Sequence, residues 1–173
     1  MPQVQPCEVP SHSFLQKYKA GAGFADCYFV EIPGQVTQAA FVAAFYTSWL
    51  FRLERTLLHY LAAKPATDAD ALQLAAGQAS SFSAWRVEAQ TVSELILADF
   101  TGRTRSWLMT ETIATPSAVT RLYFGSAVVP RISKGSQKPT LGWIFHALLG
   151  FHRLYSRLLL RAAVKRVLGV MQT

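Results

Sequence analysis

Four consecutive segments in the middle of the chain have the pattern of β-strands joined by short turns, and this feature constrains the fold most strongly. The segments are residues 82–90, 94–100, 104–114 and 118–130. Turn-forming residues such as Gly102 and Pro116 separate them, and connections this short join antiparallel neighbours. The last segment carries apolar residues on both faces, as expected when both faces of a sheet are covered. The pattern therefore predicts an antiparallel meander.

Regular structure is also predicted before the meander. The segment ADCYFVEI at residues 25–32 is rich in aromatic and β-branched residues and predicts a strand ended by a Pro-Gly pair. A long amphipathic helix is predicted over residues 37–62, with Thr37 as its N-cap, and a short helix over residues 69–77. The side of the long helix that is expected to be buried carries Val42, Tyr46, Trp49, Leu50, Leu53, Leu57, Tyr60 and Leu61.

A last helix is predicted over about residues 140–168, and its charges follow a regular spacing. Four basic residues are four positions apart, and a step of four advances a helix by only about 40°, so they form one slanted stripe. This basic stripe consists of Arg153, Arg157, Arg161 and Lys165. The opposite side, expected to lie on the sheet, carries Ile144, Leu148, Phe151, Tyr155, Leu158, Leu159 and Ala162. The stripe is then expected to face solvent or a partner.

These elements together predict an α+β fold. An antiparallel sheet of about five or more strands is expected to pack against the long C-terminal helix, with two helices after the first strand. Residues 25–168 are expected to form a single domain. Residues 1–24, which contain three prolines and the sequence AGAG, are expected to be a loose N-terminal segment. Residues 169–173 are expected to be a short tail.

Charge is distributed unevenly along the chain, whose formal net charge is +7. Residues 112–173 contain nine basic residues and no acidic one, whereas all ten acidic residues lie in 1–111. Such asymmetry suggests an anionic partner, such as a membrane surface or an acidic ligand, and a solvated basic face would explain it as well. A nucleic-acid partner is not expected, because the stripe lacks a reading motif and aromatic residues do not interleave with it. The oligomeric state is left open.

The cysteines and the apolar stretches bear on the compartment. Cys7 and Cys27 are twenty residues apart, which fits neither a metal-binding pattern nor a disulfide framework, so reduced structural cysteines are expected. No basic region followed by an apolar run marks a signal peptide. Polar residues interrupt the uncharged stretch 32–51, and the apolar stretch 141–152 is too short to cross a bilayer. A cytoplasmic location is therefore expected.

The order of the predicted elements resembles that of the START-like, or helix-grip, superfamily of polyketide cyclases and lipid-transfer proteins. Within it, the chain is similar to a group of uncharacterised bacterial proteins. The stretches that carry the resemblance are FYTSWLFRLERTLL, FSAWRVEAQTVSELILADFTGRTRSWL and LYFGSAVVP, within residues 25–168. The resemblance implies a site for an apolar or lipid-like ligand between the sheet and the C-terminal helix. The superfamily usually has a sheet of more strands than this sequence predicts, which implies a smaller or more open cavity.

Side chains that would suit such a cavity occur throughout the predicted sheet and helices. A carboxylate that points into an apolar cavity has a raised pKa, an arginine pairs with an anionic ligand group, and aromatic rings suit a flat apolar ligand. The candidates for ligand binding are Glu54, Trp85, Trp107, Glu111, Arg121, Tyr123, Phe151 and Tyr155. The basic stripe is the candidate surface for an anionic partner.

No constellation of catalytic residues or metal ligands is visible in the sequence. Ser126 does not lie in a strand-turn-helix elbow, and no histidine is near it in the sequence. His146 and His152 face different sides of a helix, so no metal site and no cofactor are expected. The leading hypothesis is a binding protein for an apolar or amphipathic small molecule. The alternatives are an interaction protein that uses the basic stripe on a membrane surface or another anionic partner, and a cyclase- or hydratase-type enzyme acting in the cavity.

Overall fold

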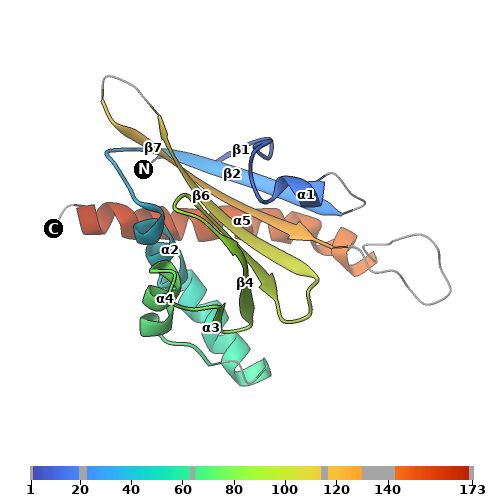
Figure 1. Cartoon of the computed structure of the whole chain (residues 1–173). Helices are drawn as coiled ribbons and strands as arrows, with labels where there is room; N and C mark the ends of the chain where they lie inside the picture. Colours follow the sequence, from blue (N-terminus) through green and yellow to red (C-terminus); the bar gives the residue numbers. More distant parts are fainter. Residues whose placement is uncertain (1, 20–22, 63–64, 114–116, 130–142, 172–173) are drawn as a thin grey trace.

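The computed structural model describes residues 2–19, 23–62, 65–113, 117–129 and 143–171, without the side chains of 57–62 and 143–151. It has an α+β fold in which a seven-stranded antiparallel sheet packs against a long C-terminal helix (Figure 1). The strands are β1 (Gln5–Pro6), β2 (Phe24–Pro33), β3 (Ser81–Phe82), β4 (Trp85–Gln90), β5 (Glu94–Asp99), β6 (Thr104–Ile113) and β7 (Val119–Val128). The helices are α1 (Gln16–Lys19), α2 (Gln38–Tyr46), α3 (Trp49–Ala62), α4 (Asp68–Ala75) and α5 (Trp143–Met171).

The predicted meander is confirmed as strands β4 to β7, each of which pairs with the next in antiparallel register. The first predicted strand, β2, pairs with β7 from Phe24 opposite Val128 to Pro33 opposite Val119. The strand order is therefore β1-β2-β7-β6-β5-β4-β3. The prediction missed β1, because two residues are too few to show an alternating pattern. It also joined Phe82 of β3 to β4 in one strand over 82–90, whereas a turn at Ser83 separates the two strands.

The long helix predicted over residues 37–62 is two helices. Thr37 is the N-cap, as predicted, and its side chain accepts a hydrogen bond from the backbone N–H of Ala40. The helix then ends at Tyr46, next to Thr47, whose hydroxyl donates to the carbonyl of Ala43 at 2.6 Å. Helix α3 begins at Trp49, after two intervening residues. The buried side was predicted by continuing one helical period from residue 37 to 62. Because the helix is interrupted, the residues after the break do not continue that period, and different side chains face the core.

Two residues of α3 show the consequence of the interruption. Trp49 and Leu53, which were expected to be buried, have exposed fractions of 66% and 59%. Phe51, which was not among the expected residues, is buried instead. The prediction was therefore wrong for Trp49 and Leu53, whereas Leu50 packs against the core as expected. The side chains of Leu57, Tyr60 and Leu61 lie outside the described residues.

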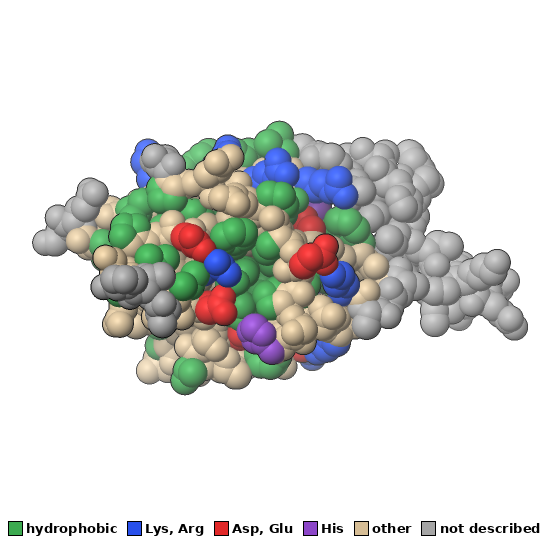
Figure 2. Space-filling model, turned by 90° about the horizontal axis from the view of Figure 1, so that it is seen from above, with side chains coloured by type: hydrophobic (Ala, Val, Ile, Leu, Met, Phe, Trp, Pro, Cys, Tyr) green, Lys and Arg blue, Asp and Glu red, His purple; other side chains and the backbone are tan. Residues whose placement is uncertain are grey.

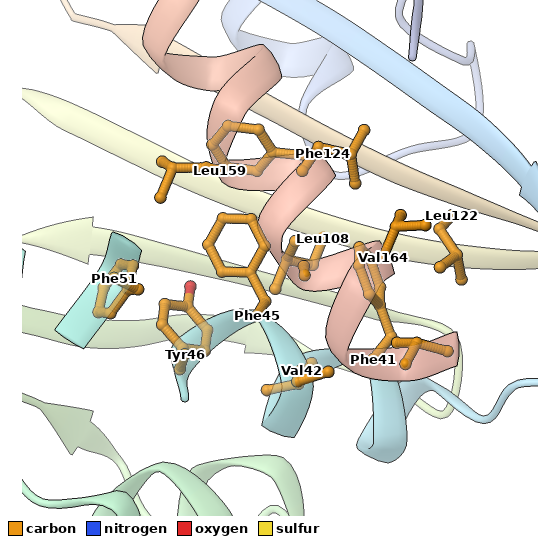
Figure 3. Packing of buried hydrophobic residues seen from close by; sticks show 14 of the residues in the cluster. Phe41, Val42, Phe45, Tyr46, Phe51, Leu108, Leu122, Phe124, Leu159 and Val164 are labelled. Carbon is orange, nitrogen blue, oxygen red and sulfur yellow. The ribbon is translucent and has the colours of Figure 1, made fainter. Parts of the chain in front are cut away.

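The face of the sheet toward α5, here called the inner face, is filled by aromatic side chains. Helices α2 and α5 lie next to each other on this face, and Phe45 of α2 reaches toward Phe124 of β7 and Leu159 of α5 (Figure 3). The ring centroids of Phe45 and Phe124 are 4.8 Å apart. Tyr46 packs edge-on against Phe51, with 4.7 Å between the ring centroids. The described part of this interior is a packed core around α2.

Helix α5 extends further than predicted, because it continues through residues 169–171, which were expected to belong to a tail. Its buried side chains include Leu159, Leu160, Ala163, Val164 and Val167. Leu158 was expected on the sheet side, but it is 40% exposed. The physical reason is helical geometry: Leu158 lies three positions before Arg161 and so shares its outward side.

The opposite, outer face of the sheet is covered by the N-terminal segment, which is not loose as expected. Strand β1 pairs with β2, and the side chains of Val9 and Leu15 are buried. Leu15 lies directly over Gly125 of β7, where an added Cβ would stand 2.5 Å from Leu15 Cδ2. The cover exists because both faces of the central strands are apolar, and the second apolar face also has to be removed from water.

Candidate functional site

A groove of about 440 Å³ lies between α2 and the C-terminal end of α5, with α4 along one side. Its volume is in the range of about 300–1,000 Å³ that is typical of small-molecule sites. The lining residues are Gln35, Val36, Thr37, Ala40, Ala43, Ala44, Thr47, Asp68, Leu72, Arg166, Val167, Val170 and Met171. Several apolar members of this lining are open to solvent, and Val170 is 70% exposed. We call this site the α2–α5 groove.

The groove exists because small side chains line α2 on the side toward α5. Ala40, Ala43 and Ala44 recur at helical spacing, and none of them is large enough to fill the space between the two helices. Val167 and Met171 are one turn apart on α5 and form part of the facing wall. Met171 also packs closely on Gly34, because a Cβ added at Gly34 would stand only 2.8 Å from Met171 Cε.

The charged residues of the groove differ in how they are paired. Asp68 receives hydrogen bonds from Arg55, at 2.7 Å, and from Arg52. Burial opposes ionisation of Asp68, but these hydrogen bonds outweigh it and lower the pKa of the carboxyl group. Arg166 forms no ion pair with any residue in the described part of the chain. At the rim of the groove, the charge of Asp68 is therefore already balanced by two arginines, whereas the charge of Arg166 is available to an anionic ligand.

A second groove, of about 490 Å³, lies between the first residues of the chain and α5. It is lined by Pro2, Gln3, Val4, Arg161, Val164, Lys165 and Leu168. Arg161 and Lys165 belong to the basic stripe, and Arg153 of the stripe is exposed as well. Arg157 differs, because its guanidinium lies over the ring of Tyr28, 5.3 Å from the centroid. The stripe is therefore open at three of its four positions.

Of the eight predicted ligand-binding residues, Glu54 and Tyr155 lie together on the inner side of the sheet. The Tyr155 hydroxyl donates a hydrogen bond to Glu54 Oε2. Burial raises the pKa of Glu54 above its usual range, and burial likewise raises the pKa of Tyr155. Trp85 is half-buried against the same core, and the Phe151 side chain lies outside the described residues. None of the three described residues lines the α2–α5 groove.

The other four predicted residues, Trp107, Glu111, Arg121 and Tyr123, lie on the outer face, away from α5. The prediction placed them beside a cavity under the helix, and the structure contradicts it. Trp107 and Tyr123 belong to the outer apolar cluster, and alternate residues of a strand point to opposite faces. Because both faces of these strands carry apolar residues, the sequence alone did not show which side chains point toward α5.

These four residues have structural partners on the outer face. The Trp107 indole N–H donates to Glu94 Oε2 at 3.0 Å, and the Tyr123 hydroxyl donates to Glu111 at 2.7 Å. Arg121 pairs with Glu31 at 2.5 Å. In the space-filling view from above, Lys and Arg side chains likewise lie beside Asp and Glu side chains, with hydrophobic groups between them (Figure 2).

The fold also creates a polar cluster that the sequence spacing did not reveal. Ser126 Oγ is 2.7 Å from His152 Nε2 of α5 and 2.7 Å from Asp26 Oδ1 of β2. Asp26 Oδ2 is also 3.7 Å from the same His152 Nε2, so the carboxylate lies on the serine side of the imidazole. A nucleophile–base pair instead needs an orienting group on the other ring nitrogen of the base. Ser126 is also buried. This arrangement ties α5 to β2 and β7, and no signal in the sequence places His152 next to Ser126.

The described residues contain no group of three His, Cys, Asp or Glu side chains arranged to hold a metal ion. Within the same residues, no helix has both the length and the apolar character that crossing a bilayer requires. Comparison of the chain with protein-family models, with curated proteins and with solved structures found no match.

Proposed function

We propose that the protein binds an amphipathic anion, with an apolar chain and a carboxylate or phosphate head, in the α2–α5 groove. The observation that carries the proposal is the combination of an open apolar lining with Arg166 at its rim, which forms no ion pair among the described residues. Covering Leu72, Val170 and Met171 with an alkyl chain removes apolar surface from water, at about 25 cal/mol per Å². An anionic head near Arg166 gains a charge-assisted hydrogen bond.

The proposed position differs from the one that the START-like resemblance implies. The order of strands and helices supports that relationship, and the proposed ligand class agrees with it. The implied cavity, however, would occupy the space in which Phe41, Phe45 and Tyr46 are fully packed. The α2–α5 groove lies on the side of α2 where the small side chains are, and this is why we place the ligand there.

The test uses dodecanoate, dodecyl phosphate and the uncharged dodecanol in calorimetric titrations, after native mass spectrometry has checked for a co-purified molecule. Ala40→Trp fills the groove, and Ala39→Trp is its matched control, because Ala39 is an exposed neighbour that does not line the groove. We expect Ala40→Trp to weaken dodecanoate binding at least about tenfold, or about 1.4 kcal/mol. Equal binding by the two tryptophan variants would exclude the groove as the site.

The head group is tested separately. Arg166→Gln is expected to weaken dodecanoate and dodecyl phosphate binding several-fold and to leave dodecanol binding unchanged, because only the charged ligands use the guanidinium. Arg153→Gln is the control, since Arg153 is an exposed arginine of the same helix outside the groove. If all three ligands weaken to the same extent in Arg166→Gln, the charge has no role in recognition.

A second candidate function is docking on an anionic membrane surface through α5. It is favoured by the exposed Leu154 and Leu158, which lie among the basic residues Arg153, Arg161 and Lys165. Apolar and cationic side chains on one helix face are typical of helices that lie in the membrane interface. Sedimentation with phosphatidylglycerol vesicles should show binding that Arg153→Gln/Arg161→Gln abolishes.

A matched control removes the same charge elsewhere. Arg86→Gln/Arg103→Gln alters two exposed arginines outside α5, one in β4 and one in the turn between β5 and β6, and should keep most of the binding to the same vesicles. Equal loss in both double variants would mean that net charge alone decides binding and that α5 is not a docking face.

A further inference from the structure

The two cysteines of the chain lie side by side in the folded protein. Their Sγ atoms are 2.9 Å apart. The pairing of β1 with β2 sets Gln5 opposite Phe29 and Pro6 opposite Tyr28, so the next pair in register is Cys7 and Cys27. The Cys7 N–H donates to the Cys27 carbonyl at 3.0 Å, which continues the ladder by one step.

This position in the sheet suits a covalent bond. Directly opposite residues of an antiparallel ladder have Cα atoms about 4.5–5.5 Å apart, and disulfides span about 4.4–6.8 Å between Cα atoms. A sulfur–sulfur bond is about 2.05 Å long, so the two sulfur atoms need to approach by less than 1 Å. The bond can therefore form by a small movement of the two side chains, without a shift of either strand's backbone.

The two thiols differ in access and in acidity. Cys7 is half-buried, whereas Cys27 has an exposed fraction of 3%. The hydrogen bond between the two thiols lowers the pKa of Cys7, and the same hydrogen bond, followed by burial, raises the pKa of Cys27. A thiolate is the attacking species in thiol–disulfide exchange. Cys7 is therefore the attacking thiol, and Cys27 is the thiol that completes the bond.

We propose that Cys7 and Cys27 form a reversible dithiol–disulfide pair that exchanges with small-molecule disulfides of the glutathione class. Cys7 attacks one sulfur of the reagent, whose sulfur–sulfur bond breaks and releases one thiol. Cys27 then attacks Cys7 Sγ and releases the second thiol. The protein loses two electrons and two protons, and the two small-molecule thiols receive them.

The bond would change how the N-terminal segment is held on the outer face. This segment carries Val9 and Leu15, which are buried against the sheet, and the bond would fix its first strand to β2. The oxidised protein is expected to unfold at a temperature higher by several degrees, because the bond constrains the unfolded chain. This inference concerns the outer face and is independent of the α2–α5 groove.

The experiment uses the full chain, reduced and freed of reductant, then incubated with oxidised glutathione and quenched with N-ethylmaleimide. Intact mass spectrometry is expected to show wild-type protein lighter by two hydrogens with no maleimide, and peptide mapping should find Cys7 joined to Cys27. Wild-type protein that keeps two alkylatable thiols, or that accumulates a stable glutathione adduct, would overturn the proposal.

Two variants assign the roles of the two sulfurs. Cys27→Ser should accumulate one glutathione on Cys7, because no second thiol displaces it, and Cys7→Ser should take up glutathione much more slowly. The same wild-type incubation in urea is the control for the fold. If the internal bond forms no more readily in the native protein than in urea, the strand pairing does not favour it and the proposal fails.

Discussion

The two faces of the sheet are both covered, but by different physical means. On the inner face, α2 and α5 pack through interlocked aromatic and aliphatic side chains around Phe45. On the outer face, a short segment without a long helix covers a smaller apolar cluster, and polar contacts hold its ends. Phe14 N–H donates to the buried carboxylate of Glu94 at 2.8 Å, and Lys17 pairs with Glu88 at 2.5 Å.

The acids on the two faces show the same difference. Glu54, on the inner side, is buried beside Tyr155, and burial raises its pKa. Glu88, on the outer side, is also partly desolvated, but hydrogen bonds from Lys17 and Tyr18 and the charge of Arg105 outweigh this and lower its pKa to about 2. Burial thus raises the pKa of Glu54 on the inner side, whereas hydrogen bonds and charge lower the pKa of Glu88 on the outer side. The following predictions test this contrast from the largest effect to the smallest.

Removing the Phe45 ring should have the largest effect. Phe45→Ala leaves a cavity between Phe124 and Leu159, and we expect it to cost about 3–5 kcal/mol of unfolding free energy, measured by urea denaturation. Phe100→Ala is the control, because Phe100 is largely exposed and should change stability by less than about 0.5 kcal/mol. A loss below about 1 kcal/mol for Phe45→Ala would mean that the inner cover does not depend on close packing.

The outer cover should respond most to loss of the Glu94 carboxylate. Glu94→Ala leaves the Trp107 indole and the Phe14 N–H without their acceptor, at a cost of about 1–3 kcal/mol. Amide hydrogen exchange should rise in residues 13–18 and not in α5. Glu94→Gln retains an acceptor oxygen and should cost less. If Glu94→Ala raised amide exchange equally in residues 13–18 and in α5, the two covers would be shown to unfold as one unit.

Acid should weaken the outer cover through Glu88. The pKa of Glu88 is lowered to about 2, below an unfolded value of about 4.3, so its contribution is complete above that value and is lost as the pH falls toward 2. Glu88→Gln should therefore be less stable than wild type at pH 7, and the two should converge near pH 2. Urea midpoints across this range measure the effect, and parallel curves would exclude this role for Glu88.

Glu54 should give the smallest effect, and its sign is opposite. Because its folded pKa is raised, its contribution to stability is complete below the unfolded pKa and is lost as the pH rises through the folded value. Glu54→Gln keeps an acceptor for Tyr155 and removes the buried charge. We expect the variant to match wild type at pH 4 and to gain less than about 1 kcal/mol at pH 8. A variant that is less stable at pH 8 would contradict this reading of Glu54.

The sequence predicted those parts of the fold that follow from local pattern. The meander, the strand that pairs with β7, the Thr37 cap and the long final helix were all recognisable from alternation, turn residues and helical period. The break after Tyr46 was missed because Thr and Ser also occur inside helices, where a Thr hydroxyl can bond to the i−4 carbonyl just as Thr47 bonds to Ala43.

The candidate site was less predictable, for a physical reason. The α2–α5 groove depends on the absence of bulk at three alanines, and alanine is common in any helix. Its walls also come from three segments whose spacing only the fold determines. The direction of Trp107 and Tyr123 was ambiguous because both faces of their strands are apolar. The N-terminal cover was missed because its prolines suggested a loose chain.

The ends of the sheet have a consequence for how copies of the protein meet at high concentration. Each outermost strand is two residues long, and β1 includes Pro6, which has no N–H to donate. Strand β4 is bent by a bulge between Val87 and Ala89. Edge strands that are short, contain proline or carry a bulge discourage two sheets from pairing edge to edge. The protein should therefore resist strand-by-strand polymerisation while it is folded.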